Sequence, residues 1–179
     1  MHARMLDQIG SPYRLVKHAA ELQGVSALIL PGGESTTLLK FFGSEGMGAA
    51  IKAFAAEGKP ILGTCAGAIL LAREVLNPPQ ESLGLLDITI ERNAYGRQIE
   101  SSMRPVEFLE PQGLVVEMPF IRAPIIRRTG TDVRVLGKVG GLPVLVEQGS
   151  VLAATFHPEL TEDETIHRHL LGRIHSPGA

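Results

Sequence analysis

The stretch Lys59-Pro60-Ile61-Leu62-Gly63-Thr64-Cys65-Ala66-Gly67-Ala68-Ile69-Leu70-Leu71-Ala72 is the part of the sequence that decides the fold. Its apolar run at 60–63 predicts a buried strand, and a helix is predicted from about 66 to 75. Cys65 stands at the junction between Gly63 and Gly67, which is the G-x-nucleophile-x-G elbow with Cys in place of Ser. Small neighbours let two backbones pass closely where such a turn forces strained backbone angles.

The elbow places Cys65 where a thiol becomes reactive. Unpaired N–H groups and the positive dipole end at a helix N-terminus favour the thiolate form. The N–H of Ala66 can also point at a developing oxyanion. The alternative is a structural cysteine buried in a tight strand–helix turn.

The single cysteine also limits the class of protein. It rules out a disulfide within the chain and a zinc site built on several thiolates. A net charge of −2 and an aromatic content of 4% without Trp argue against a nucleic-acid-binding surface. With 179 residues, of which 44% are hydrophobic, the chain is predicted to be one domain, 1–179, with a tail from about 175. It contains no apolar run long enough for a membrane span and no secretory signal, so the expected location is the cytoplasm.

Outward from the elbow, apolar runs alternate with helical patterns, which predicts an α/β domain with a mainly parallel sheet. The predicted strands are 13–17, 27–30, 60–63, 88–90, 106–108, 114–116, 133–139, 143–147 and 151–156. The predicted helices are 3–9, 38–42, 47–57, 66–75 and 161–174, the last with Thr161 as N-cap of a capping box. Residues 87–126 are expected to form hairpins or an edge extension of the sheet.

A thiolate nucleophile needs a histidine as base and acid, and His157 is the best candidate. It ends the apolar run 151–156 and precedes Pro158, and sites assemble at the carboxyl ends of parallel strands. Glu159 can turn back to hold the imidazole tautomer, as the acid of a triad does. Taken alone, His-Pro-Glu is a weak signal that favours an ordinary strand end, and it indicates a triad only in combination with the Cys65 elbow.

The other histidines are expected to be solvated or to lie in the tail. His2 and His18 lie in segments that are interpreted as solvated helix faces. His167 and His169 are two residues apart in the last helix, which is not a metal-ligand spacing. No metal site is predicted.

A glycine-rich loop, Leu30-Pro31-Gly32-Gly33-Glu34-Ser35, follows another predicted strand. Its spacing fits neither a P-loop nor a dinucleotide-binding loop. Paired glycines after a strand allow backbone N–H groups to face an anion, so the N–H of Gly33 is a candidate second oxyanion donor. An ordinary strand–helix turn, with Ser35 or Thr36 capping the helix, is the alternative.

Together, the Gly-Gly loop, the Cys65 elbow and His157-Pro158-Glu159 resemble the class I (triad) glutamine amidotransferase family. Three segments are similar to the branch that supplies ammonia for pyridoxal 5′-phosphate synthesis: 33–37 (Gly-Glu-Ser-Thr-Thr) and, more specifically, 91–98 (Glu-Arg-Asn-Ala-Tyr-Gly-Arg-Gln) and 120–124 (Phe-Ile-Arg-Ala-Pro). The resemblance covers residues 3 to about 171.

The resemblance implies a three-layer α/β fold, with helices on both faces of the sheet, that hydrolyses L-glutamine to glutamate and ammonia. It implies Cys65 as nucleophile, His157 as acid and base, Glu159 as its orienter, and Gly33 and Ala66 as oxyanion donors. The implied glutamine-binding residues are Gly33, Glu34, Ser35, Arg92, Ile121 and Arg122. The implied partner is a synthase subunit in a large hetero-oligomer, and no cofactor is expected on this chain.

The sequence departs from the family pattern at its start. The family begins with an apolar strand and a Leu-Gln-Gly turn ahead of the helix that here starts near Ala3. We interpret this as a start site placed too late or a shortened form, and expect such a form to fold weakly and to hydrolyse glutamine poorly. Two other functions stay open: the glutaminase of another amidotransferase or a γ-glutamyl hydrolase, and a non-catalytic docking or regulatory subunit.

Overall fold

Three parallel strands form the centre of the fold, with β2 (Ile61–Thr64) between β1 (Leu28–Leu30) and β10 (Val151–Ala154). The sheet continues beyond β10 through antiparallel strands in the order β9, β8, β5 and β6. These strands are β9 (Leu142–Gln148), β8 (Arg134–Val139), β5 (Ser102–Phe108) and β6 (Val115–Phe120). The computed structural model describes all residues except 34, 44–45, 94–101 and 176–179.

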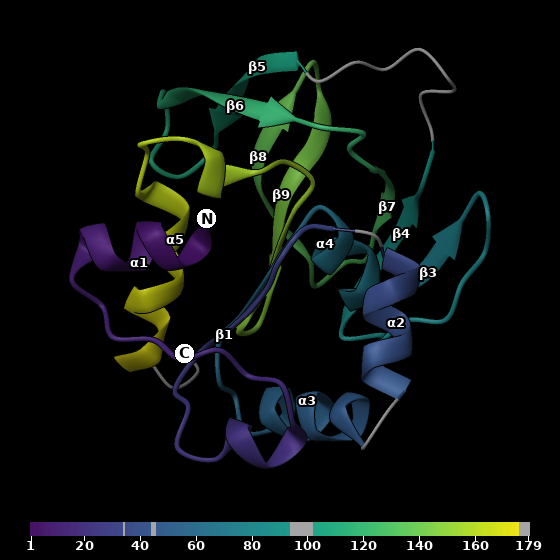
Figure 1. Ribbon diagram of the computed structural model, residues 1–179. Helices are drawn as coiled ribbons and strands as arrows, with labels where there is room; N and C mark the ends of the chain where they lie inside the picture. Colours follow the sequence, from purple (N-terminus) through teal and green to yellow (C-terminus); the bar gives the residue numbers. More distant parts are fainter. Residues whose placement is uncertain (34, 44–45, 94–101, 176–179) are drawn as a thin grey trace.

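A second, three-stranded sheet lies beside the first, as Figure 1 shows. It consists of β3 (Ala72–Leu76), β4 (Leu86–Glu91) and β7 (Ile125–Thr129), with β3 and β4 parallel and β4 and β7 antiparallel. The parallel pairings are thus confined to the β1–β2–β10 group and to β3–β4. The β5–β6 hairpin agrees with the extension that was predicted between 87 and 126.

The helices cover the two faces of the main sheet. They are α1 (His2–Ile9), α2 (Ser35–Gly43), α3 (Met47–Ala56), α4 (Ala66–Leu71) and α5 (Thr165–Gly172), with 3-10 turns η1 (Ala19–Leu22), η3 (Pro158–Leu160) and η4 (Arg173–His175). In Figure 1, α1 and α5 lie on one side of the sheet, and α2, α3 and α4 on the other. The longest described helix has 10 residues, so no helix in the described part of the chain is long enough to cross a membrane.

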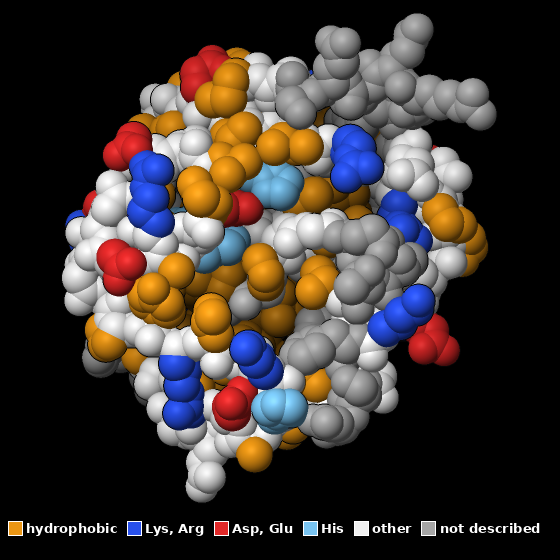
Figure 2. Space-filling view, viewed as in Figure 1, with side chains coloured by type: hydrophobic (Ala, Val, Ile, Leu, Met, Phe, Trp, Pro, Cys, Tyr) orange, Lys and Arg blue, Asp and Glu red, His pale blue; other side chains and the backbone are white. Residues whose placement is uncertain are grey.

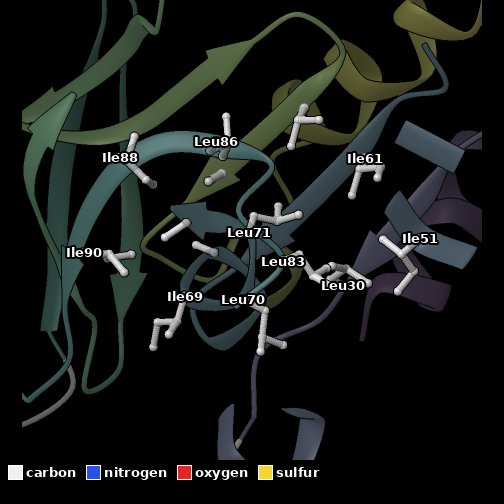
Figure 3. Close-up of a cluster of buried hydrophobic side chains, with 14 of the residues drawn as sticks. Leu30, Ile51, Ile61, Ile69, Leu70, Leu71, Leu83, Leu86, Ile88 and Ile90 are labelled. Carbon is white, nitrogen blue, oxygen red and sulfur yellow. The ribbon is translucent and has the colours of Figure 1, made fainter. Parts of the chain in front are cut away.

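The core divides into two clusters because successive side chains of a strand point to opposite faces. On β2, Ile61 packs with α3 and α4, whereas its neighbour Leu62 packs with the α5 side. Figure 3 shows part of the first cluster, which includes Ile51 of α3, Ile61 of β2 and Leu70 of α4. This alternation produces the three layers and confirms the predicted fold class.

The predicted helix 66–75 is wrong in its second half, since α4 ends at Leu71 and β3 follows at once. A β-bulge between Ala72 and Glu74 shifts the register against β4. The buried residues Ala72 and Val75 are therefore three apart, which imitates the spacing of a helix face.

Two further predictions of secondary structure differ from the structure. Residues 13–17 form no strand; Tyr13 and Leu15 are exposed, and no strand pairs with this segment in the described part of the chain. The last helix starts at Thr165 rather than near 161. Thr161 does not cap this helix: it is the C-cap of η3, where its hydroxyl donates to Pro158 O and accepts from Asp163 N.

We predict that Gly67→Ala strongly destabilises the fold. A Cβ at this position would lie 2.0 Å from the backbone oxygen of Leu30, so β1 or α4 would have to move. Overpacking costs about 1–3 kcal/mol in most cores, and a clash with backbone belongs at or above the upper end of that range. Urea unfolding measures the loss. Gly172→Ala, which meets no atom within 4 Å, is the matched control and should leave the free energy of unfolding within about 0.5 kcal/mol.

Candidate active site

Cys65 occupies a strained turn between β2 and α4. Its backbone angles are φ 49° and ψ −102°, and the residue is only 8% exposed. Its N–H donates to Ala154 O of the neighbouring strand β10 at 2.8 Å. A Cβ on Gly63 would lie 2.6 Å from the carbonyl carbon of Gly67, so the turn closes only with glycine on both sides of the cysteine.

His157 and Glu159 lie at the carboxyl end of β10, next to the end of β2. The backbone N–H of His157 donates to Pro119 O at 3.0 Å, which fixes the path of the chain as it leaves β10. Its Nδ1 lies 2.8 Å from Glu159 Oε1, and Glu159 is buried at the start of η3. The imidazole lies beside Cys65, whose side chain raises the pKa of His157. Because Nδ1 of His157 is hydrogen-bonded to the Glu159 carboxylate, Nε2 is the ring nitrogen that is available to the thiol of Cys65.

The electrostatic interactions among Cys65, His157 and Glu159 support one another. Burial disfavours a charged His157, yet hydrogen bonds and attraction to Cys65 and Glu159 outweigh it and raise the pKa of His157 to about 10. Burial also opposes ionisation of Glu159, but His157, together with His2, lowers the pKa of that carboxyl. The arrangement therefore holds a protonated imidazole between a sulfur and a carboxylate, ready to donate a proton.

The Gly-Gly loop after β1 lies directly against the imidazole. A Cβ on Gly32 would lie 2.5 Å from His157 Cε1 and 3.5 Å from Cys65 Cβ. Gly33 has φ +147°, which an L side chain rarely adopts. Gly32 is not among the predicted site residues, although its place in the glycine pair is the signal that marks it.

A pocket of about 450 Å³ opens at Cys65 and His157. It is lined by Gly33, Ser35, Cys65, Ala66, Ile69, Arg92, Asn93, Ile121, Arg122, Pro124 and His157. Figure 2 shows histidine and acidic side chains near the middle of this face, with hydrophobic side chains gathered around them. The described residues include no group of three or more His, Cys, Asp or Glu side chains that could hold a metal ion.

The pocket brings together most of the residues expected from the sequence. Glu159 lies behind His157 rather than on the pocket wall, and Glu34 falls outside the described residues. Ile69, Asn93 and Pro124 were not predicted. Asn93 and Pro124 flank predicted residues, and Ile69 follows Cys65 by one helical turn.

Two arginines give the pocket its positive charge. Arg92 and Arg122 line it from different segments, after β4 and before β7. Neither guanidinium forms an ion pair within the described part of the chain. Unpaired guanidinium groups in a pocket are suited to a carboxylate ligand.

The expectation that His2 and His167 are solvated is wrong. His167 is fully buried, and the side chain of His2 is 11% exposed. Helix α1 packs against α5 and η3, which buries both rings. His169 is 35% exposed and lies 3.1 Å from Glu147, and His18 is exposed. Short helices with few apolar residues do not reveal from sequence which face is covered.

A family model for the SNO glutamine amidotransferase family matches residues 1–175. The chain belongs to this family. The resemblance drawn from the three motifs is thereby confirmed.

Curated members of the family share about half of their residues with this chain. The protein of Deinococcus radiodurans named pyridoxal 5′-phosphate synthase subunit PdxT is 48% identical over 178 residues, covering 96% of this chain and 89% of the relative. A PdxT protein of Thermus thermophilus is 50% identical over 173 residues, covering 95% of this chain and 89% of the relative. A crystal structure of a glutamine amidotransferase superimposes with a TM-score of 0.91 at 44% identity, covering 98% of this chain and 93% of that one.

We predict that Cys65→Ala lowers the pKa of His157. The variant removes one of the two groups that raise this pKa, while burial, which lowers it, remains. NMR titration of the histidine ring signals measures the change, with the His157→Gln variant identifying the resonance. A wild-type pKa near 6.5, or the same value in both proteins, would contradict the geometry.

The sign of the corresponding stability effect follows from the same shift. Because the pKa of His157 is raised from 6.5 to about 10, its protonation stabilises the folded state fully below pH 6.5. That contribution is lost as the pH rises towards 10.

Proposed function

We propose that this chain is the glutaminase subunit of a pyridoxal 5′-phosphate synthase, hydrolysing L-glutamine through Cys65, His157 and Glu159. One observation carries the proposal: an imidazole 2.8 Å from a buried carboxylate lies beside the Cys65 thiol, at a pocket that Arg92 and Arg122 line. The names of the closely similar relatives support the pathway assignment.

The proposed reaction begins with attack of Cys65 Sγ on the side-chain amide carbon of glutamine. The negative charge that develops on the amide oxygen is held by the backbone N–H groups of Gly33 and Ala66. His157 donates its proton to the leaving nitrogen, so ammonia departs and a thioester remains. His157 then takes a proton from water, the resulting nucleophile attacks the thioester, and glutamate is released as Cys65 is regenerated.

The remaining proposed residues hold the substrate. Arg92 and Arg122 suit the α-carboxylate of glutamine because guanidinium groups donate paired hydrogen bonds to carboxylates. Ser35 and Ile121 line the same pocket, and Glu34 completes the proposed set from the same loop. Glu159 keeps Nδ1 of His157 protonated, so that Nε2 is the atom that donates the proton to the leaving nitrogen and later accepts one from water.

The partner in this proposal is a synthase subunit, which assembles with the glutaminase in a large hetero-oligomer and receives the ammonia. The synthase builds pyridoxal phosphate from a pentose phosphate and a triose phosphate, and this chain does not bind the finished cofactor. The cytoplasm keeps a free nucleophilic thiol reduced, and it is the proposed location.

We expect Cys65→Ala to lower kcat for glutamine hydrolysis by about 10³-fold or more, because the nucleophile cannot be replaced by water at the same position. Ammonia release, measured with the synthase subunit present, gives the rate. A variant that retains a tenth of the wild-type rate would refute a cysteine mechanism. If ammonia were incorporated only with a different synthase, the pathway assignment would be wrong, but the proposed hydrolysis of glutamine would stand.

We expect Arg122→Ala and Arg92→Ala each to raise KM for glutamine about 10–100-fold, the effect of losing a charge-assisted hydrogen bond. Arg127→Ala is the matched control. Arg127 pairs with Glu91 at 2.5 Å on the surface of the small sheet, outside the pocket lining, so its KM should equal that of the wild type. Unchanged KM in both pocket variants would remove the arginines from the substrate site.

A further inference from the structure

Glu159 has a second carboxylate oxygen that the proposed triad does not use. Its Oε1 takes the Nδ1 hydrogen of His157, whereas Oε2 is buried and makes no hydrogen bond within the described part of the chain. The ring nitrogen Nε2 of His2 lies 3.4 Å from Oε2. Two imidazoles, from opposite ends of the sequence, therefore flank one carboxylate.

His2 is held in place on both sides of its ring. Its Nδ1 lies 2.9 Å from Nε2 of the fully buried His167 of α5. Its Nε2 lies 3.1 Å from the hydroxyl of Thr64, the residue immediately before Cys65. The two histidine rings are 5.1 Å apart between centroids and tilted by 50°. A side chain fixed by three partners is not a loose helix end.

The carboxylate selects the tautomer of His2. Hydrogen on Nε2 points a donor towards Glu159 Oε2 and Thr64, whereas hydrogen on Nδ1 would leave a lone pair 3.4 Å from a carboxylate oxygen. With hydrogen on Nε2, the Nδ1 atom of His2 accepts from Nε2 of His167. Nδ1 of His167 is then a bare acceptor, and it is the ring atom that is buried without a partner in the described part of the chain. An unpaired acceptor is better tolerated than an unpaired N–H.

We propose that His2 is a positioning residue for the proposed glutaminase site, holding Glu159 by its second oxygen and tying it through Thr64 to the cysteine elbow. This inference rests on the proposed function. The resulting row runs His167, His2, Glu159, His157, Cys65, and links α5, α1, η3 and β2 around the reacting sulfur.

The charge state of His2 suits this role. Burial lowers the pKa of His2 to about 4, so near neutral pH the ring is uncharged. An uncharged donor fixes the carboxylate without neutralising it, and the negative charge of Glu159 stays available to the imidazolium of His157. A carboxylate free to rotate would present its oxygen to Nδ1 for only part of the time, which lowers the rate of the chemical step rather than the affinity for glutamine.

The test compares two amides at position 2 in the complex with the synthase subunit. His2→Gln places its amide nitrogen near the position of Nε2 and keeps a donor for Glu159. His2→Asn is shorter, reaches only the position of Nδ1, and keeps a partner for His167 while losing Glu159. His169→Asn is the control, since His169 contacts a different carboxylate, Glu147, outside the pocket lining.

We expect His2→Asn to lower kcat about 10–100-fold, because it removes the donor that lies 3.4 Å from the charged carboxylate, with KM within about 2-fold of the wild type. His2→Gln should recover most of kcat, and His169→Asn should match the wild type. Equal kcat in His2→Asn and wild type, or equal losses in the Asn and Gln variants, would overturn the inference. Cys65→Ala is run alongside: if it keeps activity, the proposed function fails, whatever the His2 variants show.

Discussion

Close contact between backbones at the cysteine elbow is the constraint on which the rest of the structure depends. Gly67 of α4 packs on the carbonyl of Leu30 in β1, and Gly63 of β2 packs on Gly67. Gly32 then brings the next loop onto His157. These contacts set β1, β2, α4 and the Gly-Gly loop at distances that no side chain would allow. The sulfur, the imidazole and the proposed oxyanion donors are therefore positioned by backbone packing rather than by flexible side chains.

A row of polar groups crosses this apolar core, and its members compensate for one another's burial. Removing Glu159 or His157 from water carries a free-energy cost, which their 2.8 Å contact offsets. His2 and His167 extend the row to helices α1 and α5. Breaking one member leaves the next group buried and unpaired, which explains why a change at residue 2 is expected to reach Cys65.

Sequence reasoning recovered the parts of the site that have local signatures. The Cys65 elbow, the His157–Glu159 pair and the Gly-Gly loop each follow a strand, and the ends of adjacent parallel strands must meet. It missed Gly32 as a packing residue, because only the folded geometry shows that a Cβ there would strike His157. It also misjudged His2 and His167, whose burial depends on α1 meeting α5, a contact 165 positions apart in the sequence. The helix predicted over β3 was wrong for a different reason: a β-bulge spaces the buried residues of this strand as they would be spaced on a helix face.

The measurement that tests the account most directly is mass spectrometry of the chain after treatment with a glutamine-like electrophile. Cys65 is the single cysteine, so the count of labelled thiols has one interpretation. The account predicts one adduct per chain, located on Cys65, and protection by L-glutamine but not by an amino acid without the side-chain amide. Labelling that glutamine does not slow, or an adduct on any other residue, would contradict the central claim that Cys65 attacks bound glutamine.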